Sequence, residues 1–260
     1  MSRLEETFRS SGKKALLMPY TTGGYPDMEG CRRVMEAFVA GGADMIELGV
    51  PFSDPVADGP VVQASTQQAL DNGVTPDDVL QLAGEFSLRL PVVLMIYYNC
   101  VLAGGQERFI KAAADAGVAG LIVPDLPVDE AEEFIDDCVK SGVDPVLLVA
   151  PTSPDERIRM IAEKASGFIY CVAVAGVTGA RTSLSDELPG FLGRVRAQTD
   201  VPLAVGFGVS SPEHAAVVAQ YADGVIIGSR LIRMVGEAED IDTACLNVEK
   251  FLKDVNEVLK

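Results

Sequence analysis

The stretch DPVLLVAPTSPDERIRMIAEK, residues 144–164, contains the unit from which the fold is built. It begins with an almost wholly apolar run, 144–151, and a continuous apolar run bounded by proline or glycine is typical of a parallel strand covered on both faces. The next residues, SPDE at 153–156, have the pattern of a helix start, in which a capping residue precedes proline and acids. The stretch therefore predicts one strand followed by one amphipathic helix.

Apolar runs of this kind recur along the chain, each followed by a loop and a longer amphipathic segment. The predicted strands lie within 15–22, 44–50, 91–99, 119–126, 144–151, 167–174, 201–208 and 223–229. The predicted helices are 27–40, 75–90, 103–116, 128–140, 153–164, 184–198, 211–220 and 242–259. Eight strands alternating with helices in 260 residues predict an α/β protein with a (β/α)8 or TIM barrel.

The structural alternative is a doubly wound open sheet. Such a sheet usually carries fewer strands and a glycine-rich turn of the form GxGxxG after the first one. The turn here is TTGGYPD, residues 21–27, which lacks that spacing. The chain has no linker and no shift of composition, so we expect residues 1–260 to form a single domain.

Composition narrows the class of partner and the chemistry. The formal charge is −17, which argues against nucleic acid and anionic membranes as partners because both require a basic face. The five cysteines are widely spaced, which fits neither a disulfide framework nor a zinc site and indicates reduced thiols. Without a signal peptide or a membrane-length apolar run, we expect a cytoplasmic protein. The single histidine, His214, lies at a predicted helix start, where a surface or capping position is expected.

In a (β/α)8 barrel the catalytic groups stand at the carboxyl ends of the strands. No lysine stands at any of these ends, which argues against Schiff-base chemistry, and no Cys/His cluster supports a metal. Carboxylates are therefore the remaining candidates for catalytic groups. Glu47 lies within an apolar strand, on the side of Met45 and opposite Ile46 and Leu48, so burial inside the barrel would raise its pKa and suit it to proton transfer. The alternative is a glutamate at the rim paired with a basic residue.

The loop GVPFSDPVADGP, residues 49–60, follows Glu47. Asp54 precedes a proline and Asp58 precedes a glycine, and both pairs are typical of turns. Spacing alone therefore favours a structural role for both residues. A mobile loop that carries one catalytic carboxylate is the alternative.

Glycine-rich turns end the last two predicted strands. GFGVSSPEH (206–214) and DGVIIGSR (223–230) each lead into a helix start, where backbone N–H groups and the helix dipole favour an anion. The loops after strands seven and eight are the usual phosphate site of such barrels, and AGVTGAR (175–181) would complete the wall. These turns predict a small phosphorylated substrate held by backbone dipoles.

Several of these motifs resemble those of a known protein family. ELGVPFSDPVADGP (47–60) is similar to the signature of the tryptophan synthase alpha subunit, and PYTTGGYPD, LIVPDLPVDE, AGVTGA, GFGVSSPE and DGVIIGS follow in that family's order and spacing. The resemblance implies a lyase of tryptophan biosynthesis that cleaves indole-3-glycerol phosphate to indole and glyceraldehyde 3-phosphate. It implies no cofactor in this chain, and a pyridoxal-phosphate-dependent beta subunit that receives the indole in an α2β2 complex.

The resemblance also implies roles for individual residues. Glu47 would be the general acid–base, and Asp58 would accept the indole N–H bond and stabilise charge on the ring, while Asp54 stays a loop residue. The implied indole pocket is lined by Tyr20, Met95, Tyr97, Ile122, Pro124 and Tyr170. Other implied substrate contacts are Thr178 and Gly179 in a closing loop, Phe207, and the phosphate-binding Gly179, Gly208, Gly228 and Ser229.

The sequence differs from the family pattern at two places, and three other functions remain as alternatives. Ala173-Val174 stand where the family often has Arg or Ser, and Tyr20 stands where Phe is common. The chain could instead be a barrel that serves mainly as an allosteric partner of the beta subunit, another phosphosugar barrel such as an isomerase or the synthase that forms indole-glycerol phosphate, or a stand-alone lyase. The expected docking surfaces are the 51–60 loop with the helix after it, and residues 100–105.

Overall fold

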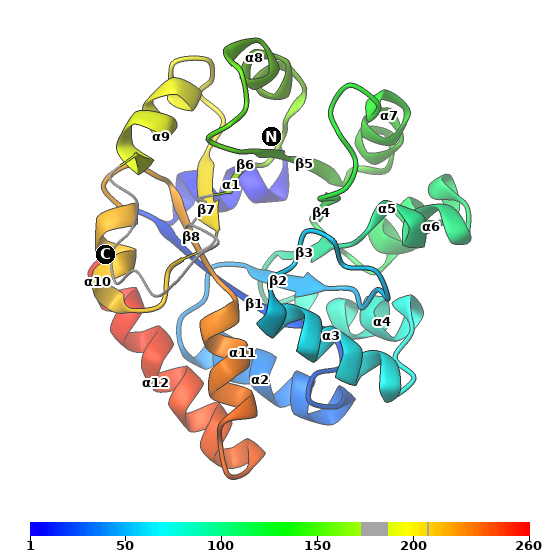
Figure 1. Cartoon of the computed structure of the whole chain (residues 1–260), viewed down its shortest axis with the longest axis vertical. Coiled ribbons are helices and arrows are strands. Elements are labelled where there is room, and N and C mark those ends of the chain that lie inside the picture. The colour runs from blue at the N-terminus through cyan, green and yellow to red at the C-terminus, as the bar shows by residue number, and fades with distance from the viewer. Residues whose placement is uncertain (173–186, 207) are drawn as a thin grey trace.

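The computed structural model describes residues 1–172, 187–206 and 208–260. Within these ranges eight parallel strands close into a barrel in chain order, with β8 hydrogen-bonded to β1 (Figure 1). The strands are β1 Leu16–Thr22, β2 Ile46–Gly49, β3 Val92–Met95, β4 Gly120–Ile122, β5 Asp144–Val149, β6 Ile169–Val172, β7 Leu203–Gly206 and β8 Gly224–Ile227. The predicted (β/α)8 fold is confirmed.

The helices surround the barrel, as Figure 1 shows. They are α1 Arg3–Ser10, α2 Met28–Ala40, α3 Pro60–Asp71, α4 Pro76–Ser87, α5 Tyr98–Ala103, α6 Gln106–Asp115, α7 Glu132–Ser141, α8 Asp155–Lys164, α9 Leu188–Arg196, α10 Pro212–Val218, α11 Ser229–Gly236 and α12 Ile241–Leu259. None of those in the described ranges is both long and apolar enough to cross a bilayer.

Local sequence signals determine where several helices begin and end. Thr75 caps α4 by accepting from the backbone N–H of Asp78, whose side chain accepts from the N–H of Thr75 in return. The helix α7 ends at Gly142, whose φ of 74° lies in the left-handed region that favours glycine. These signals were readable in the sequence, and the predicted segments were correct there to within a few residues.

The predicted third strand was too long at its carboxyl end. Residues 91–99 were assigned to it, but β3 ends at Met95 and α5 begins at Tyr98. The N–H of Tyr98 donates to Asp125 Oδ1 at 2.8 Å, so a carboxylate from the segment after β4 satisfies the first turn of this helix. That acceptor is distant in sequence, and the local pattern could not reveal it.

Side chains alternate between the inside of the barrel and the layer beneath the helices. Met45 belongs to the cluster inside the barrel, whereas Ile46 and Leu48 belong to the larger outer cluster. The register places Glu47 beside Tyr20 on one neighbouring strand and Val93 on the other. The alternation predicted for this strand is therefore confirmed.

Helix α1 closes the amino-terminal end of the barrel, and Figure 1 shows it behind the strands. No helix was predicted for residues 3–10, although Ser2 and Glu5 form a capping box there. Leu4 is fully buried in the interior cluster, close to the backbones of Gly120 and Gly167 at the starts of β4 and β6. The opposite, carboxyl end of the barrel is the end that faces the viewer.

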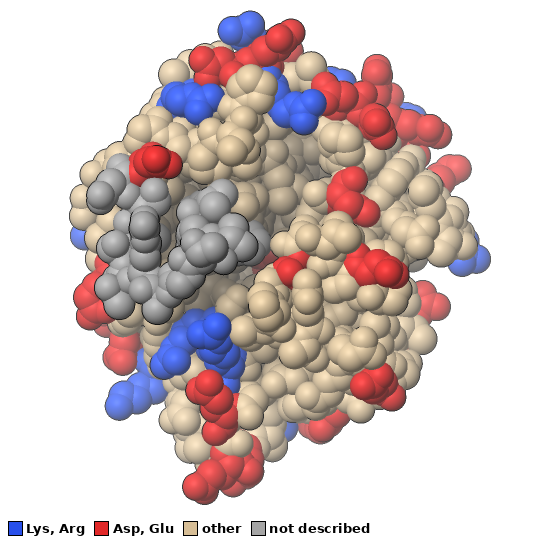
Figure 2. All heavy atoms as spheres, viewed as in Figure 1, with Lys and Arg blue, Asp and Glu red and all other residues tan. Residues whose placement is uncertain are grey.

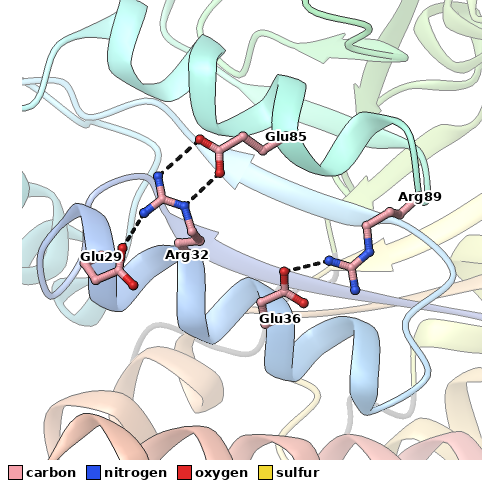
Figure 3. A network of polar contacts seen from close by, with 5 residues as sticks. All are labelled: Glu29, Arg32, Glu36, Glu85 and Arg89. Atoms are coloured by element: carbon pink, nitrogen blue, oxygen red, sulfur yellow. Dashed lines mark hydrogen bonds and ion pairs between the residues drawn. The ribbon is translucent and has the colours of Figure 1, made fainter.

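On the outside, α2 and α4 are joined by ion pairs (Figure 3). Arg32 donates twice to Glu85, at 2.7 and 3.1 Å, and also contacts Glu29, while Arg89 donates to Glu36 at 2.6 Å. These side chains are exposed, and exposed pairs contribute only about 0–1 kcal/mol each. They favour the packing of these two helices, but the buried core supplies most of the stability.

Replacement of Leu4 by alanine should destabilise the chain because it leaves a cavity inside the barrel. We expect the free energy of unfolding, measured by urea denaturation, to fall by about 2–5 kcal/mol. Leu88→Ala is the matched control, since Leu88 is 91% exposed and its truncation should change stability by less than about 0.5 kcal/mol. Equal losses in the two variants would contradict the role assigned to α1.

Candidate active site

Glu47 lies inside the barrel near the carboxyl end of β2. Its side chain is only 1% exposed, and among the described residues its Oε2 has no hydrogen-bond partner. Burial raises the pKa of its carboxyl group to about 8, with a further contribution from the negative charge of Asp58. The alternative of a rim glutamate paired with a basic residue is therefore wrong, and the expected burial inside the barrel is found, because no ion pair within the described ranges involves Glu47.

Asp58 lies in the loop between β2 and α3. Its backbone N–H donates to the carbonyl of Pro55 at 3.0 Å, so the turn that its sequence pattern indicated does form. Its side chain also accepts, at Oδ2, a 3.1 Å hydrogen bond from the hydroxyl of Tyr97. Burial raises the pKa of this carboxyl to about 6, and the bond from Tyr97 opposes the rise. Asp58 therefore makes the turn and also presents a partly buried carboxylate.

The two carboxyl groups share one electrostatic environment with two tyrosines. Tyr20 on β1 and Tyr170 on β6 are buried, and burial, with the charges of Glu47 and Asp58 adding to it, raises the pKa of both phenols well above the usual value. Both phenols therefore remain neutral. Since the pKa values of Glu47 and Asp58 are near 8 and 6, the pair holds a single proton near neutral pH, mainly on Glu47.

A cavity of about 410 Å³ opens at the carboxyl ends of β3 to β6. Figure 2 views this face, which is hollowed near its centre. The predicted Asp58, Met95 and Pro124 line the cavity. Leu148 on β5 also lines the cavity. It was not among the predicted residues, although its position two residues after Val146 indicated an inward side chain.

The other predicted pocket residues lie close by but outside the lining of this cavity. Ile122 and Tyr170 belong to the cluster inside the barrel, and Tyr20 lies beside Glu47 in the register of β1 and β2. Tyr97 is 3% exposed and its hydroxyl is bound to the loop that carries Asp58. The barrel thus brings the predicted aromatic and aliphatic residues together at the carboxyl ends of its strands and in its interior.

Two residues predicted to bind phosphate, Gly228 and Ser229, lie at the start of α11. Gly228 is the capping residue of this helix and Ser229 its first residue, and the first N–H groups of a helix lack intrahelical acceptors. A Cβ at Gly228 would lie 3.1 Å from the ring of Tyr20, so the close packing favours glycine. Gly208 is exposed and has a φ of 86°. Thr178, Gly179 and Phe207 lie outside the described residues, as do Ala173 and Val174.

The charge around α11 differs from the charge of the chain as a whole. Its first turn contains no acidic residue, as in α3, α5 and α9 and in contrast to α1, α2, α4, α7 and α8. Arg230 lies in its first turn and Arg233 in its last, and Figure 2 shows basic side chains gathered in the region of α11. An anion at this helix start would therefore meet local positive charge on an otherwise acidic protein.

The histidine and the cysteines, which were considered as metal ligands or for other catalytic chemistry, form no such site among the described residues. His214 lies in the first turn of α10, where its backbone N–H donates to Oγ of the capping residue Ser211 at 3.3 Å, so His214 is not itself the cap. All five cysteines are unpaired. Over the described ranges, no three His, Cys, Asp or Glu side chains are grouped as metal ligands would be.

Glu47→Gln should change how stability depends on pH. Because the folded-state pKa of Glu47 lies above its ordinary value of 4.5, the native chain loses stability as pH rises from about 4.5 to about 8. Glutamine does not titrate, so the stability of the variant relative to the unmodified chain should grow by on the order of 3 kcal/mol between pH 5 and pH 8. Thermal unfolding at several pH values measures this, with the exposed Glu6→Gln as control. A constant difference across that range would contradict the buried environment of Glu47.

Comparison with known proteins gives a consistent result. The family model described as "Tryptophan synthase alpha chain" matches residues 7–260. The tryptophan synthase alpha chain of Roseiflexus sp. is 49% identical over 244 residues, covering 92% of this chain and 93% of that protein. That of Dehalococcoides mccartyi is 42% identical and covers 100% of both. A crystal structure of tryptophan synthase from M. tuberculosis in an aminoacrylate-bound form is similar with a TM-score of 0.89 and 36% identity, over 100% of each chain. The alpha chain from Legionella pneumophila has a TM-score of 0.89 and 35% identity, covering 100% of this chain and 97% of that one.

Proposed function

The chain belongs to the tryptophan synthase alpha chain family, and on that premise we propose that Glu47 and Asp58 perform its chemistry. The reaction is the retro-aldol cleavage of indole-3-glycerol phosphate to indole and glyceraldehyde 3-phosphate. The observation that carries the assignment is the pair of carboxyl groups at the mouth and in the interior of the barrel, both with pKa values raised by burial and that of Glu47 raised further.

The first step is protonation of the indole ring. Near neutral pH Glu47 is in its acid form, because its pKa is about 8, and it can donate its proton to C3 of indole. The ring then carries a positive charge centred on its N–H group. Asp58 is ionised at that pH, accepts a hydrogen bond from this N–H and stabilises the charge as it develops.

The second step breaks the carbon–carbon bond. The carboxylate that Glu47 has become removes the proton from the hydroxyl on the adjacent side-chain carbon, and a carbonyl forms there. The electron pair of the breaking bond returns to the ring, which neutralises its positive charge and releases indole. Glu47 ends the cycle protonated, so no other acid or base is required.

The phosphate group is held at the other side of the mouth. Backbone N–H groups at Gly208, Gly228 and Ser229 are the described donors for it, and Gly179 would add another. The start of α11 supports this role because its first turn lacks acidic residues and basic side chains gather in the region of this helix (Figure 2). Met95, Pro124 and Leu148, which line the cavity, would contact the indole ring.

The expected partner is a beta chain of tryptophan synthase, in an α2β2 complex in the cytoplasm, with pyridoxal phosphate in the beta chain and no cofactor in this one. Two apolar side chains support a docking surface beside the cavity, since Val56 is 82% exposed in the loop before α3 and Leu102 is 50% exposed in α5. Residues 1–260 form one domain in this proposal, because α1 packs into the barrel and α12 packs on β1 and α2.

Substitution of either carboxylate should abolish most of the lyase activity. We expect Glu47→Gln to lower the rate of indole release by about two to four orders of magnitude, and Asp58→Asn by about two to three, with unchanged circular dichroism. The measurement is indole release by the purified chain, with and without a beta chain.

Asp54→Asn is the matched control for Asp58→Asn, since Asp54 is an exposed residue of the same loop. Near-normal turnover by Glu47→Gln would show that another group transfers the proton. If the unmodified chain released no indole under either condition, the lyase assignment itself would be wrong, and an allosteric barrel of low intrinsic activity would be favoured.

The docking surface can be tested with a charge. Leu102→Asp should weaken binding of the beta chain by about tenfold or more, because a carboxylate would be buried in the complex without a partner. Isothermal titration calorimetry measures the affinity, with Val139→Asp on α7 as the control at a 62% exposed apolar residue. Equal affinities for the two variants would place the docking surface elsewhere.

A further inference from the structure

The side chain of Tyr97 connects the end of β3 to the loop that carries Asp58. Its hydroxyl donates to Asp58 Oδ2 at 3.1 Å and accepts from the N–H of Ala57 at 3.0 Å. Its ring stacks on Phe52 at the start of the same loop, with centroids 5.0 Å apart and planes inclined by 27°. One side chain therefore contacts the loop at both of its ends.

These contacts hold Asp58 in a defined orientation. The loop itself is largely exposed, with Val56 82% exposed, whereas Tyr97 is 3% exposed and fixed in the core. Because the hydroxyl of Tyr97 accepts from Ala57, its own proton is directed at Oδ2 of Asp58. Within the described part of the chain, Oδ1 of Asp58 has no hydrogen-bond partner, which leaves that atom for a ligand.

We propose that Tyr97 is a positioning residue for the cleavage reaction. Its hydroxyl binds one oxygen of Asp58 and thereby directs the other oxygen toward the N–H of the indole ring. The inference rests on the proposed function and adds to it a role that is distinct from lining the pocket. The hydroxyl supports this role, because a side chain that only lined the pocket with apolar surface would not need the two hydrogen bonds.

The charged and titratable groups around Asp58 make the pH dependence informative. The titratable groups that interact electrostatically with Asp58 are Glu47 on β2, Tyr20 on β1, Tyr170 on β6 and Tyr97, which lies between β3 and α5. Of these, only the hydrogen bond from Tyr97 lowers the pKa of Asp58, against the larger effect of burial. Loss of the hydroxyl alone should therefore move the pKa of Asp58 upward from about 6.

Tyr97→Phe tests the proposal because it removes the hydroxyl and keeps the stacked ring. With the chain assayed alone and in complex with its beta chain, we expect kcat for indole release to fall about 10- to 100-fold and KM to change by less than about threefold. The acid limb of the kcat/KM profile should move to higher pH, because protonated Asp58 can no longer accept the N–H bond.

The direction of that shift separates positioning from a merely structural effect. If the variant only loosened the loop, Asp58 would gain water and its pKa would fall toward the ordinary value, so the acid limb would move to lower pH. Phe52→Leu provides this comparison, since it weakens the stacking and keeps the hydroxyl, and it should not move the limb upward.

Tyr98→Phe is the matched control at the neighbouring residue. The hydroxyl of Tyr98 donates to Gln106 Oε1 at 2.7 Å, away from Asp58, and its loss should leave both kcat and the pH profile unchanged. An active unmodified chain together with a Tyr97→Phe variant of equal kcat and unshifted acid limb would overturn the positioning role and leave the lyase function intact. A downward shift of the limb would also overturn it.

Discussion

The carboxyl group of Glu47 is held inside the barrel, almost without exposure to water and, at Oε2, without a partner among the described residues. Such burial is unfavourable for the charged form, and this cost raises the pKa of the group to about 8. The proposed chemistry depends on that constraint, since an acid able to protonate a carbon atom near neutral pH must retain its proton until the substrate arrives. The rest of the site can be understood as what this acid requires. In the proposed mechanism, the acid needs an ionised partner that accepts the ring N–H, apolar side chains that contact the ring, and an anchor for the phosphate.

In the proposed mechanism, Asp58 must stay ionised although it lies close to the buried Glu47. Its lesser burial makes this possible. Asp58 lies in an exposed loop that turns inward at one point, so it is less buried than Glu47 and its pKa is lower, at about 6. The loop is joined to the rigid end of β3 through the Tyr97 side chain. An exposed loop can thus carry a carboxylate whose direction is set by the barrel, which combines access for the substrate with a fixed geometry for the reaction.

The overall charge of −17 describes the surface rather than the site. An acidic exterior repels anions at long range, but salt screens that repulsion over about 10 Å. At the start of α11, the backbone N–H groups, the first turn without acids and the nearby basic side chains favour an anion locally. The charge of the chain therefore excludes a nucleic-acid partner more convincingly than it argues against a small phosphorylated substrate.

The sequence by itself determined the strand–helix repeat, the closure into a barrel and the inward direction of Glu47, because burial of strands on both faces and the alternation of side chains leave direct patterns in the chain. It left Asp58 ambiguous, since Asp-Gly is a common turn whatever the carboxylate does, and only the family resemblance favoured a catalytic role. Tertiary structure decided which way that carboxylate faces, how far the two pKa values differ, that β3 ends at Met95 and that α1 closes the barrel. Each of these depends on contacts between residues distant in sequence, such as Tyr97 with Asp58 and Tyr98 with Asp125, and no local pattern encodes such contacts.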